Sequence, residues 1–262
     1  LKMVGCPFLL QSTLMLYQRF QRPEFDWTIT VKIMLPIVLG NLMNNCFFGG
    51  IVIARCILME INGRLREILQ EVNRLQTPTE LLLQKPYYRM QRFCDLADSV
   101  DELSVMYFRT TGYSMEYLAL TAFSLVTSMA INLTCTTLGF YTQYQALADY
   151  IMLEEPYDIY QALAHFVFLV VPFAEIYLLS RVCQQLLDET SETGNLLQRI
   201  NLEHADVRFR QVVDAMWLQV STIKYKLIPM GLLELNASLI NKIFTTVGGF
   251  LLYLIQNDLT LR

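Results

Sequence analysis

The chain has 262 residues, of which 54% are hydrophobic and 17% carry a charge. Soluble domains carry a charge on about a quarter of their residues, so this composition argues against an ordinary soluble protein. The formal net charge of −4 argues against a nucleic-acid partner, because backbone phosphates require a basic surface. The six cysteines form no CxxC pair and lie apart from histidine, so we expect neither a disulfide framework nor a metal site.

The apolar residues are concentrated in long uncharged stretches, as is typical of a membrane protein. A bilayer core of about 30 Å requires about 20 mostly apolar residues in each crossing helix. The uncharged stretches cover residues 3–18, 33–54, 117–148, 159–174 and 243–257. With Glu175 and Lys242 near a membrane face, they predict an all-α, polytopic membrane helix bundle with four complete spans and one partial span. The chain begins at Leu1 inside an apolar run, so we expect its true N-terminus to be missing.

The basic residues predict how the spans are oriented, since Lys and Arg accumulate in cytoplasmic loops. They gather between Glu60 and Ser114 and again between Arg181 and Lys226. Residues 143–158 contain acidic residues but no Lys or Arg. We therefore expect the two basic segments in the cytosol, residues 143–158 outside the cell, and an extracellular C-terminus on a protein of the plasma membrane.

The predicted elements follow from these stretches in chain order. We expect a partial span with an outer loop over 1–29, a span with a cytosolic extension over 30–76, a cytosolic helix leading into a span over 77–145, an extracellular loop over 146–156, a span with a cytosolic extension over 157–203, a cytosolic helix over 204–228, and a last span with an extracellular end over 229–262.

Long cytosolic extensions are predicted because apolar residues recur at helical spacing between charged ones. The stripe of the first extension is Leu65, Ile68, Leu69, Val72 and Leu75. The stripe that precedes the next span is Phe93, Leu96, Val100, Leu103 and Tyr107. Pro78 is expected to end the first helix, and Thr193-Gly194-Asn195 to end the extension after the third span. No nucleophile, base and orienting group share a readable spacing, so we expect a structural bundle without enzyme activity or cofactor.

Several short motifs carry a resemblance to a known family. In chain order they are INGRL at 61–65, CDLA at 94–97, CQQ at 183–185, WLQ at 217–219 and GLLELN at 231–236, followed by an apolar run that ends at Gln256. In order and spacing they resemble the C-terminal half of insect gustatory receptors, from about residue 32 onward.

The resemblance implies a seven-helix chemoreceptor, similar to insect odorant receptors, that assembles as a tetrameric ligand-gated cation channel. The spans here would be part of the third helix and the fourth to seventh. The seventh is split in that family, here into a cytosolic anchor at about 206–226 and a pore-lining piece at about 230–258. Pro229 fits the break, because proline disfavours helix at the preceding residue. The implied partners are a small-molecule tastant, membrane lipid and other receptor subunits.

The end of the last span carries the candidate gate by the same resemblance. The family signature is Thr-Tyr, five apolar residues and Gln-Phe, whereas residues 249–257 read GF, LLYLI and QN. The candidate pore and gate residues are Leu252, Ile255, Gln256 and Asn257. Gln256 and Asn257 would form polar rings beside a hydrophobic constriction at Ile255 or Leu252, which gates by dewetting. Alternatively, Asn257 faces the extracellular interface.

Two ionisable residues of the last span are candidates for the inner vestibule. Glu234 and Lys242 are costly in lipid, and their spacing of eight residues places them on about one helical face. A ring of Glu234 at the inner mouth would favour cations. The alternative is that Glu234 caps a helix or forms a salt bridge near the membrane face.

The outer halves of the earlier spans contain the candidate ligand pocket. Its residues are Asn44, Asn45, Thr127, Ser128, Asn132, Tyr141, Tyr160 and His165. Aromatic walls with a few hydrogen-bonding groups are typical of small-molecule sites. A buried amide requires a partner, which is either a ligand or a neighbouring helix. His165 stands alone, so a metal site is not expected there.

We interpret the chain as a subunit of a tastant-gated, non-selective cation channel, in a homo- or heterotetramer. The ligand class expected first is a bitter or other small organic compound, and a pheromone-like cue is second. A G-protein-coupled receptor is the alternative within seven-helix chemoreceptors, although it would place the C-terminus inside. A membrane transporter is a further alternative, but only Glu175, Glu234 and Lys242 approach the buried ionisable groups that it requires.

Overall fold

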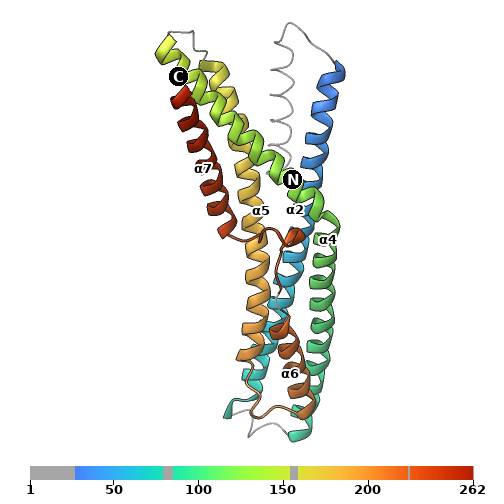
Figure 1. The fold of residues 1–262 in the computed structure, drawn as a ribbon. Helices are drawn as coiled ribbons and strands as arrows, with labels where there is room; N and C mark the ends of the chain where they lie inside the picture. The colour runs from blue at the N-terminus through green and yellow to red at the C-terminus, as the bar shows by residue number, and fades with distance from the viewer. Residues whose placement is uncertain (1–26, 79–84, 154–158, 224, 262) are drawn as a thin grey trace. The chain divides into compact units, whose positions relative to one another are not determined.

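The computed structural model describes residues 27–78, 85–153, 159–223 and 225–261, and within this part every regular element is helical. The α-helices are α2 (Trp27–Leu75), α4 (Pro86–Leu153), α5 (Ile159–Arg199), α6 (Val207–Thr222) and α7 (Ser238–Leu261), with the short 3-10 helix η1 (Pro229–Gly231) before α7 (Figure 1). The predicted partial span lies almost wholly outside the described residues.

Within the described residues, three helical segments are long and apolar enough to cross a bilayer. They are Leu42–Leu75, Pro86–Met152 and Ser238–Thr260. The helix α4 has 68 residues, far more than the about 20 that a bilayer requires, so it extends well beyond any membrane it crosses. The helix α5 is not among the three, and the fourth complete span stays a prediction.

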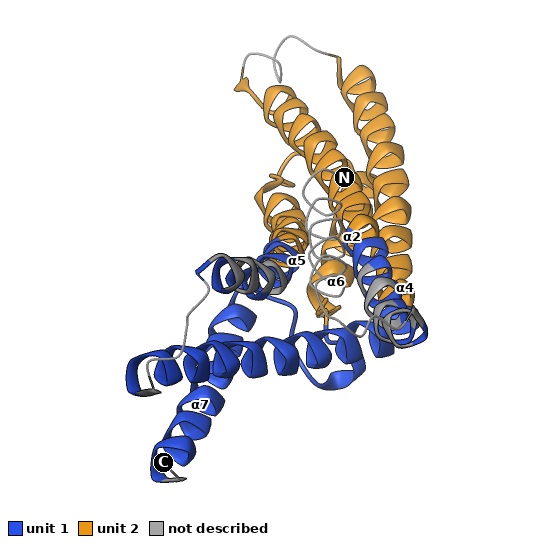
Figure 2. Ribbon diagram, turned by 90° about the horizontal axis from the view of Figure 1, so that it is seen from above, with its two compact units in different colours: residues 1–48, 119–181, 228–262 blue, residues 49–118, 182–227 orange. Residues whose placement is uncertain are grey.

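The chain divides into two compact units (Figure 2). Unit 1 comprises residues 1–48, 119–181 and 228–262, and unit 2 comprises residues 49–118 and 182–227. The long helices α2, α4 and α5 each contribute to both units. The sequence explains this division, because the uncharged stretches fall mainly in unit 1 and the charged amphipathic stretches in unit 2.

Unit 2 is a helical bundle with a continuous apolar core. Leu65, Ile68, Val72 and Leu75 of α2 are buried, as their spacing predicts. The stripe on α4 is buried in the same way at Phe93, Val100, Leu103 and Tyr107. If the unfolded segment is exposed to water, burying each leucine or phenylalanine side chain contributes about 1.5–3 kcal/mol to the free energy of folding. The prediction of amphipathic helix faces is therefore confirmed here, although Leu69 and Leu96 of the predicted stripes are half-buried rather than buried.

Within unit 2, the short helix α6 is held to α4 by an aromatic contact and an ion pair. Phe209 of α6 and Phe93 of α4 are both buried, with ring centroids 5.5 Å apart. Arg208 pairs with Asp98 at the surface of the same two helices. Asp206 caps the N-terminus of α6, since its side chain accepts a hydrogen bond from the backbone N–H of Arg208 at 3.0 Å.

In the described part of unit 1, fewer side chains are buried than in unit 2, and many large apolar side chains are exposed. Phe173 of α5 stacks on Phe244 of α7 with ring centroids 5.1 Å apart. The exposed side chains include Phe123, Leu163, Phe250 and Leu120, the last of them 83% exposed. Water would disfavour such a surface, whereas the acyl chains of a bilayer solvate it. This unit is built as the membrane part of a multi-pass protein.

Two predicted boundaries differ from the structure. The loop expected over 146–156 is helical as far as Leu153, because residues 146–153 are mostly good helix formers that continue α4. The extension expected to end near Thr193 runs on to Arg199. Here Gly194 stays helical, because tertiary packing holds α5 in place: Thr193 is fully buried and donates a hydrogen bond to Asn62 of α2.

The break before α7 is longer than the sequence indicates. Met230 and Gly231 have positive φ angles of 52° and 71°, which stop helix formation directly after Pro229. The helix α7 then begins at Ser238 rather than near 230, because the side chain of Asn236 accepts hydrogen bonds from the backbone N–H and the hydroxyl of Ser238.

Candidate functional site

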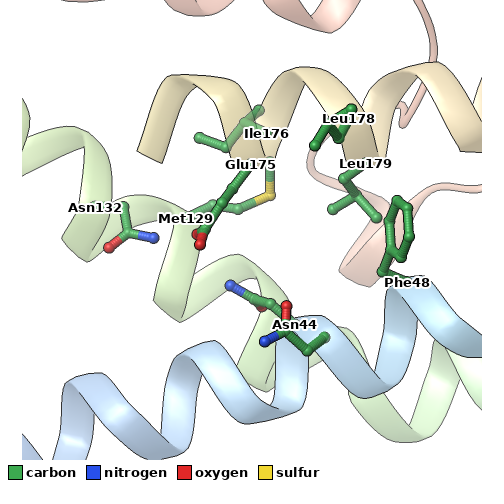
Figure 3. Close-up of a pocket in the computed structure, with 9 residues that line it drawn as sticks. Asn44, Phe48, Met129, Asn132, Glu175, Ile176, Leu178 and Leu179 are labelled. Carbon is green, nitrogen blue, oxygen red and sulfur yellow. The ribbon is translucent and has the colours of Figure 1, made fainter. Parts of the chain in front are cut away.

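A small cavity lies inside unit 1 between α2, α4 and α5 (Figure 3). Its volume is ≈ 30 Å³, which is room for about one or two water-sized groups. Its lining residues are Asn44, Asn45 and Phe48 of α2, Met129 and Asn132 of α4, and Glu175, Ile176, Leu178 and Leu179 of α5. Apolar walls thus surround polar side chains that come from all of these helices.

Helical periodicity brings the lining residues together. Asn44 and Phe48 are four residues apart on α2, as are Glu175 and Leu179 on α5, so each pair lies on one helix face. The approach of α4 to α2 is close at Gly40, where a Cβ atom would lie 3.3 Å from Oγ of Ser128. A glycine at this position lets the polar residues on either side of the contact meet.

Asn44 makes one of its hydrogen bonds within the protein. Its Nδ2 donates to Oγ of Ser128 across the contact between α2 and α4, at 2.8 Å. Its Oδ1 is buried and has no hydrogen-bond partner in the described part of the chain. Hydrogen bonding between helices therefore accounts for the amide nitrogen of Asn44, whereas the carbonyl oxygen of this cavity-lining residue remains available as an acceptor in the described part of the chain.

Among the described residues that line the cavity, Glu175 alone is acidic. Figure 3 shows its carboxylate reaching from α5 toward α2, where Asn44 lies. Its Oε1 is buried without a hydrogen-bond partner, and none of the ion pairs among the described residues includes Glu175. The sequence placed this residue near a membrane face. The sequence did not predict that Glu175 lines the cavity, because the residues that surround it belong to other helices.

The structure brings part of the predicted ligand pocket together. Asn44, Asn45 and Asn132 line the cavity, and Ser128 supports Asn44. Thr127 is exposed and does not line the cavity. Tyr141 also lies outside the lining, where its hydroxyl accepts a hydrogen bond from Gln145 at 2.9 Å.

Two further residues of the predicted ligand pocket are Tyr160 and His165. The side chains of Tyr160 and His165 lie outside the described ones. The helix α5 carries both positions. Their contribution to a ligand site stays a prediction.

The helix α7 presents the predicted pore residues away from its packed side. Leu239, Ile243 and Val247 are buried against the chain, whereas Leu252, Gln256 and Asn257 are exposed and Ile255 is half-buried. Val247 and Gln256 are nine residues apart, which is about two and a half helical turns. Gln256 therefore projects from the side of α7 opposite to Val247, together with Leu252 one turn earlier.

The shared helical face predicted for Glu234 and Lys242 is wrong. Glu234 lies in the non-helical segment before α7, and Lys242 is in the second turn of that helix. The spacing argument assumed a helix from about 230, which the positive φ angles at Met230 and Gly231 prevent. Glu234 is half-buried and Lys242 is exposed.

Two of the short sequence motifs contribute buried groups to unit 2. Asn62 of INGRL donates from Nδ2 to the backbone oxygen and Oε2 of Glu189 on α5, at 3.0 and 2.9 Å. Its Oδ1 accepts from the hydroxyl of Thr193 at 2.7 Å. Asn62 and Thr193 are fully buried, so this network joins α2 to α5 through satisfied polar groups.

Cys183 of the CQQ motif is also fully buried. Burial raises the pKa of its thiol to about 12. Nearby, burial raises the pKa of Tyr225 to about 12 as well, although its hydrogen bond with Ser114 acts in the opposite direction. We interpret these groups as structural, because Cys183 is fully buried, Tyr225 is half-buried, and neither is in the charged form near neutral pH.

This burial predicts a difference in thiol reactivity between two cysteines of unit 2. At pH 8, a thiol with a pKa of about 12 is ionised to about 0.01%, and only the thiolate reacts rapidly. After brief treatment of the folded receptor with N-ethylmaleimide, mass spectrometry should find half-buried Cys94 labelled and Cys183 unlabelled. Equal labelling rates before unfolding would contradict the packing described here.

Comparison with known proteins gives one family and two relatives. The model of the family described as 7tm chemosensory receptors matches residues 1–261. "Putative gustatory receptor 97a" of Drosophila melanogaster is 52% identical over 264 residues, which is 100% of this chain and 62% of that protein. "Putative gustatory receptor 94a" of the same species is 41% identical over 261 residues, which is 100% of this chain and 65% of that protein. The chain therefore spans less than two thirds of the length of these relatives.

Proposed function

We propose that this chain, which belongs to the family of 7tm chemosensory receptors, is the C-terminal part of a gustatory receptor subunit that forms a tastant-gated, non-selective cation channel. The family is one of receptors rather than enzymes, and the two relatives are named gustatory receptors. The subunit acts in a homo- or heterotetramer in the plasma membrane, with its C-terminus outside the cell. Its ligand is a small organic compound, with a bitter compound as the first expectation.

The construction of α7 is the observation that supports a channel most strongly. The segment Ser238–Thr260 is long and apolar enough to cross a bilayer, and a non-helical break separates it from α6. One side of α7 packs on its own chain, and the opposite side exposes Gln256 near the end of the helix. An amide at this position in an apolar helix requires water or a second subunit, and a central pore supplies both.

The proposed gate follows from the residues that share the exposed side of α7. Leu252 and Gln256 are one turn apart, so four copies around an axis form an apolar ring beside a polar ring. An apolar ring of small radius excludes water and ions until the helices separate. Ligand binding in unit 1 acts on this ring because α5 contacts α7 through the stacked rings of Phe173 and Phe244.

Electrical recording from the full-length receptor tests this proposal. Excised membrane patches should pass cation current when a panel of bitter compounds is applied, without added nucleotide or G protein. Cells without the receptor serve as the control. A response that disappears when G-protein signalling is blocked, with no ligand-opened current in patches, would contradict the channel and favour a G-protein-coupled receptor.

A further inference from the structure

The cavity between α2, α4 and α5 contains more acceptor atoms than the described chain satisfies. Oδ1 of Asn44 and Oε1 of Glu175 are both buried, and neither has a hydrogen-bond partner in the described residues. A buried acceptor without a donor is costly, and a buried carboxylate is the costliest case in an apolar surrounding. A group that both donates hydrogen bonds and carries positive charge would satisfy the two acceptors together.

The described part of unit 1 offers no positive charge to Glu175. Its described basic residues are Lys32, Arg181 and Lys242, and all three are exposed. None of them forms an ion pair with Glu175. Among the described residues, the Asn44 side chain donates its hydrogen bond to Ser128, and as a neutral amide it supplies no charge to the carboxylate.

The size and lining of the cavity restrict what can supply the charge. A volume of ≈ 30 Å³ accepts an ammonium group, and because the cavity is not fully enclosed, the hydrocarbon part of an amine can extend beyond it. One carboxylate and neutral amides match a single positive charge, whereas calcium and magnesium sites use more carboxylate oxygens. Phe48, Ile176 and Leu179 surround the polar groups with apolar contacts, which suit the hydrocarbon part of an amine.

We infer that this cavity binds the protonated ammonium group of a small organic amine, with Glu175 as its counter-charge and Asn44 as a hydrogen-bond acceptor. Asn132 completes the polar lining from α4, and Figure 3 shows the three side chains reaching from three different helices. The inference rests on the proposed function, because it assigns a chemical class to the tastant. It narrows the proposed class of tastant from small organic compounds to amines.

The experiment compares a charged probe with neutral and inorganic ones on the purified full-length receptor. Thermal unfolding is measured with n-hexylamine, with hexanol and with sodium chloride, each added to the same buffer at the same pH. The amine should raise the unfolding temperature in proportion to its concentration, whereas hexanol should have little effect. If hexanol acts as strongly as the amine, or if sodium at equal concentration replaces it, the inference is overturned.

The Glu175→Gln variant keeps the shape of the side chain and removes the charge. Its apparent affinity for n-hexylamine should fall about tenfold or more. Tyr177→Phe is the matched control, since Tyr177 is exposed on the same helix outside the cavity and should bind the amine as the wild type does. Equal amine binding by Glu175→Gln and the wild type would overturn the assignment.

These experiments distinguish a failure of the channel proposal from a failure of the amine-site proposal. Amine binding is read from stability and needs no current, so a receptor that binds the amine but conducts no ions contradicts only the channel. A receptor that conducts in response to other compounds but is not stabilised by the amine contradicts only the amine site. The comparison of amine with alcohol uses the wild type, so it remains decisive if Glu175→Gln does not fold.

Discussion

Replacing Asn62 by leucine should lower the stability of the receptor by about 2–4 kcal/mol. Leucine has a similar volume, so the change removes hydrogen bonds without opening a large cavity. The variant loses the two bonds from Nδ2 to Glu189 and leaves the hydroxyl of Thr193 with Glu189 alone. Thermal unfolding of the full-length receptor in detergent, followed by size-exclusion chromatography, measures the loss as a lower transition temperature.

Gly63→Ala is the matched control for Asn62→Leu. It changes the neighbouring residue of the same helix, and a Cβ atom at position 63 meets no atom within 4 Å. Alanine favours helix by up to about 1 kcal/mol over glycine, so this variant should be as stable as the wild type or slightly more stable. If Asn62→Leu unfolds at the same temperature as Gly63→Ala, the network does not hold α2 to α5.

Gln256→Leu should reduce the single-channel conductance of the full-length receptor severalfold. The change extends the apolar ring of Leu252 by one helical turn, so water and ions meet a longer dewetted constriction. Gln256 is exposed, so we expect normal folding and surface expression. Single-channel recording measures the conductance, and surface labelling of the same cells checks that the variant reaches the membrane.

Leu254→Val is the control for this change. Leu254 lies seven residues after Val247, about two full turns, and therefore on the packed side of α7. The single-channel conductance of the Leu254→Val receptor should match that of the wild type. Unchanged conductance in Gln256→Leu, with normal surface expression, would remove Gln256 from the ion path.

The sequence predicted those features that depend on local periodicity. Leu65, Ile68, Val72 and Leu75 are buried because their spacing matches one face of a helix, and Leu69 at the edge of that face is half-buried. The helix α2 ends at Leu75, shortly before Pro78, as the sequence indicates. Such features need no information about distant residues, because a single helix turn determines which side chains lie on one face.

The sequence could not predict those features that depend on packing between distant segments. Thr193-Gly194-Asn195 reads as a helix end, but the contacts of Thr193 with Asn62 keep α5 helical there. The start of α7 depends on backbone angles at Met230 and Gly231 that proline alone does not specify. Pro229 correctly predicted a break in the helix before α7, but the local sequence did not predict how long the non-helical segment is.

The candidate site was predictable only in part for the same reason. Asparagines within apolar runs are unusual enough to single out Asn44, Asn45 and Asn132, and these three line the cavity. Glu175 was expected near a membrane face because it follows an apolar run directly. Its environment is set by α2 and α4, so the sequence of α5 alone gives no sign of the unpartnered oxygen.

The most direct test of the account asks whether position 256 lies in the ion path. Gln256→Cys and Leu254→Cys would be made in the full-length receptor, and a positively charged methanethiosulfonate reagent applied from outside during ligand-evoked current. The account predicts rapid, irreversible block of the current in Gln256→Cys and no effect in Leu254→Cys. Unchanged current in Gln256→Cys after confirmed labelling would contradict the claim that α7 lines the pore.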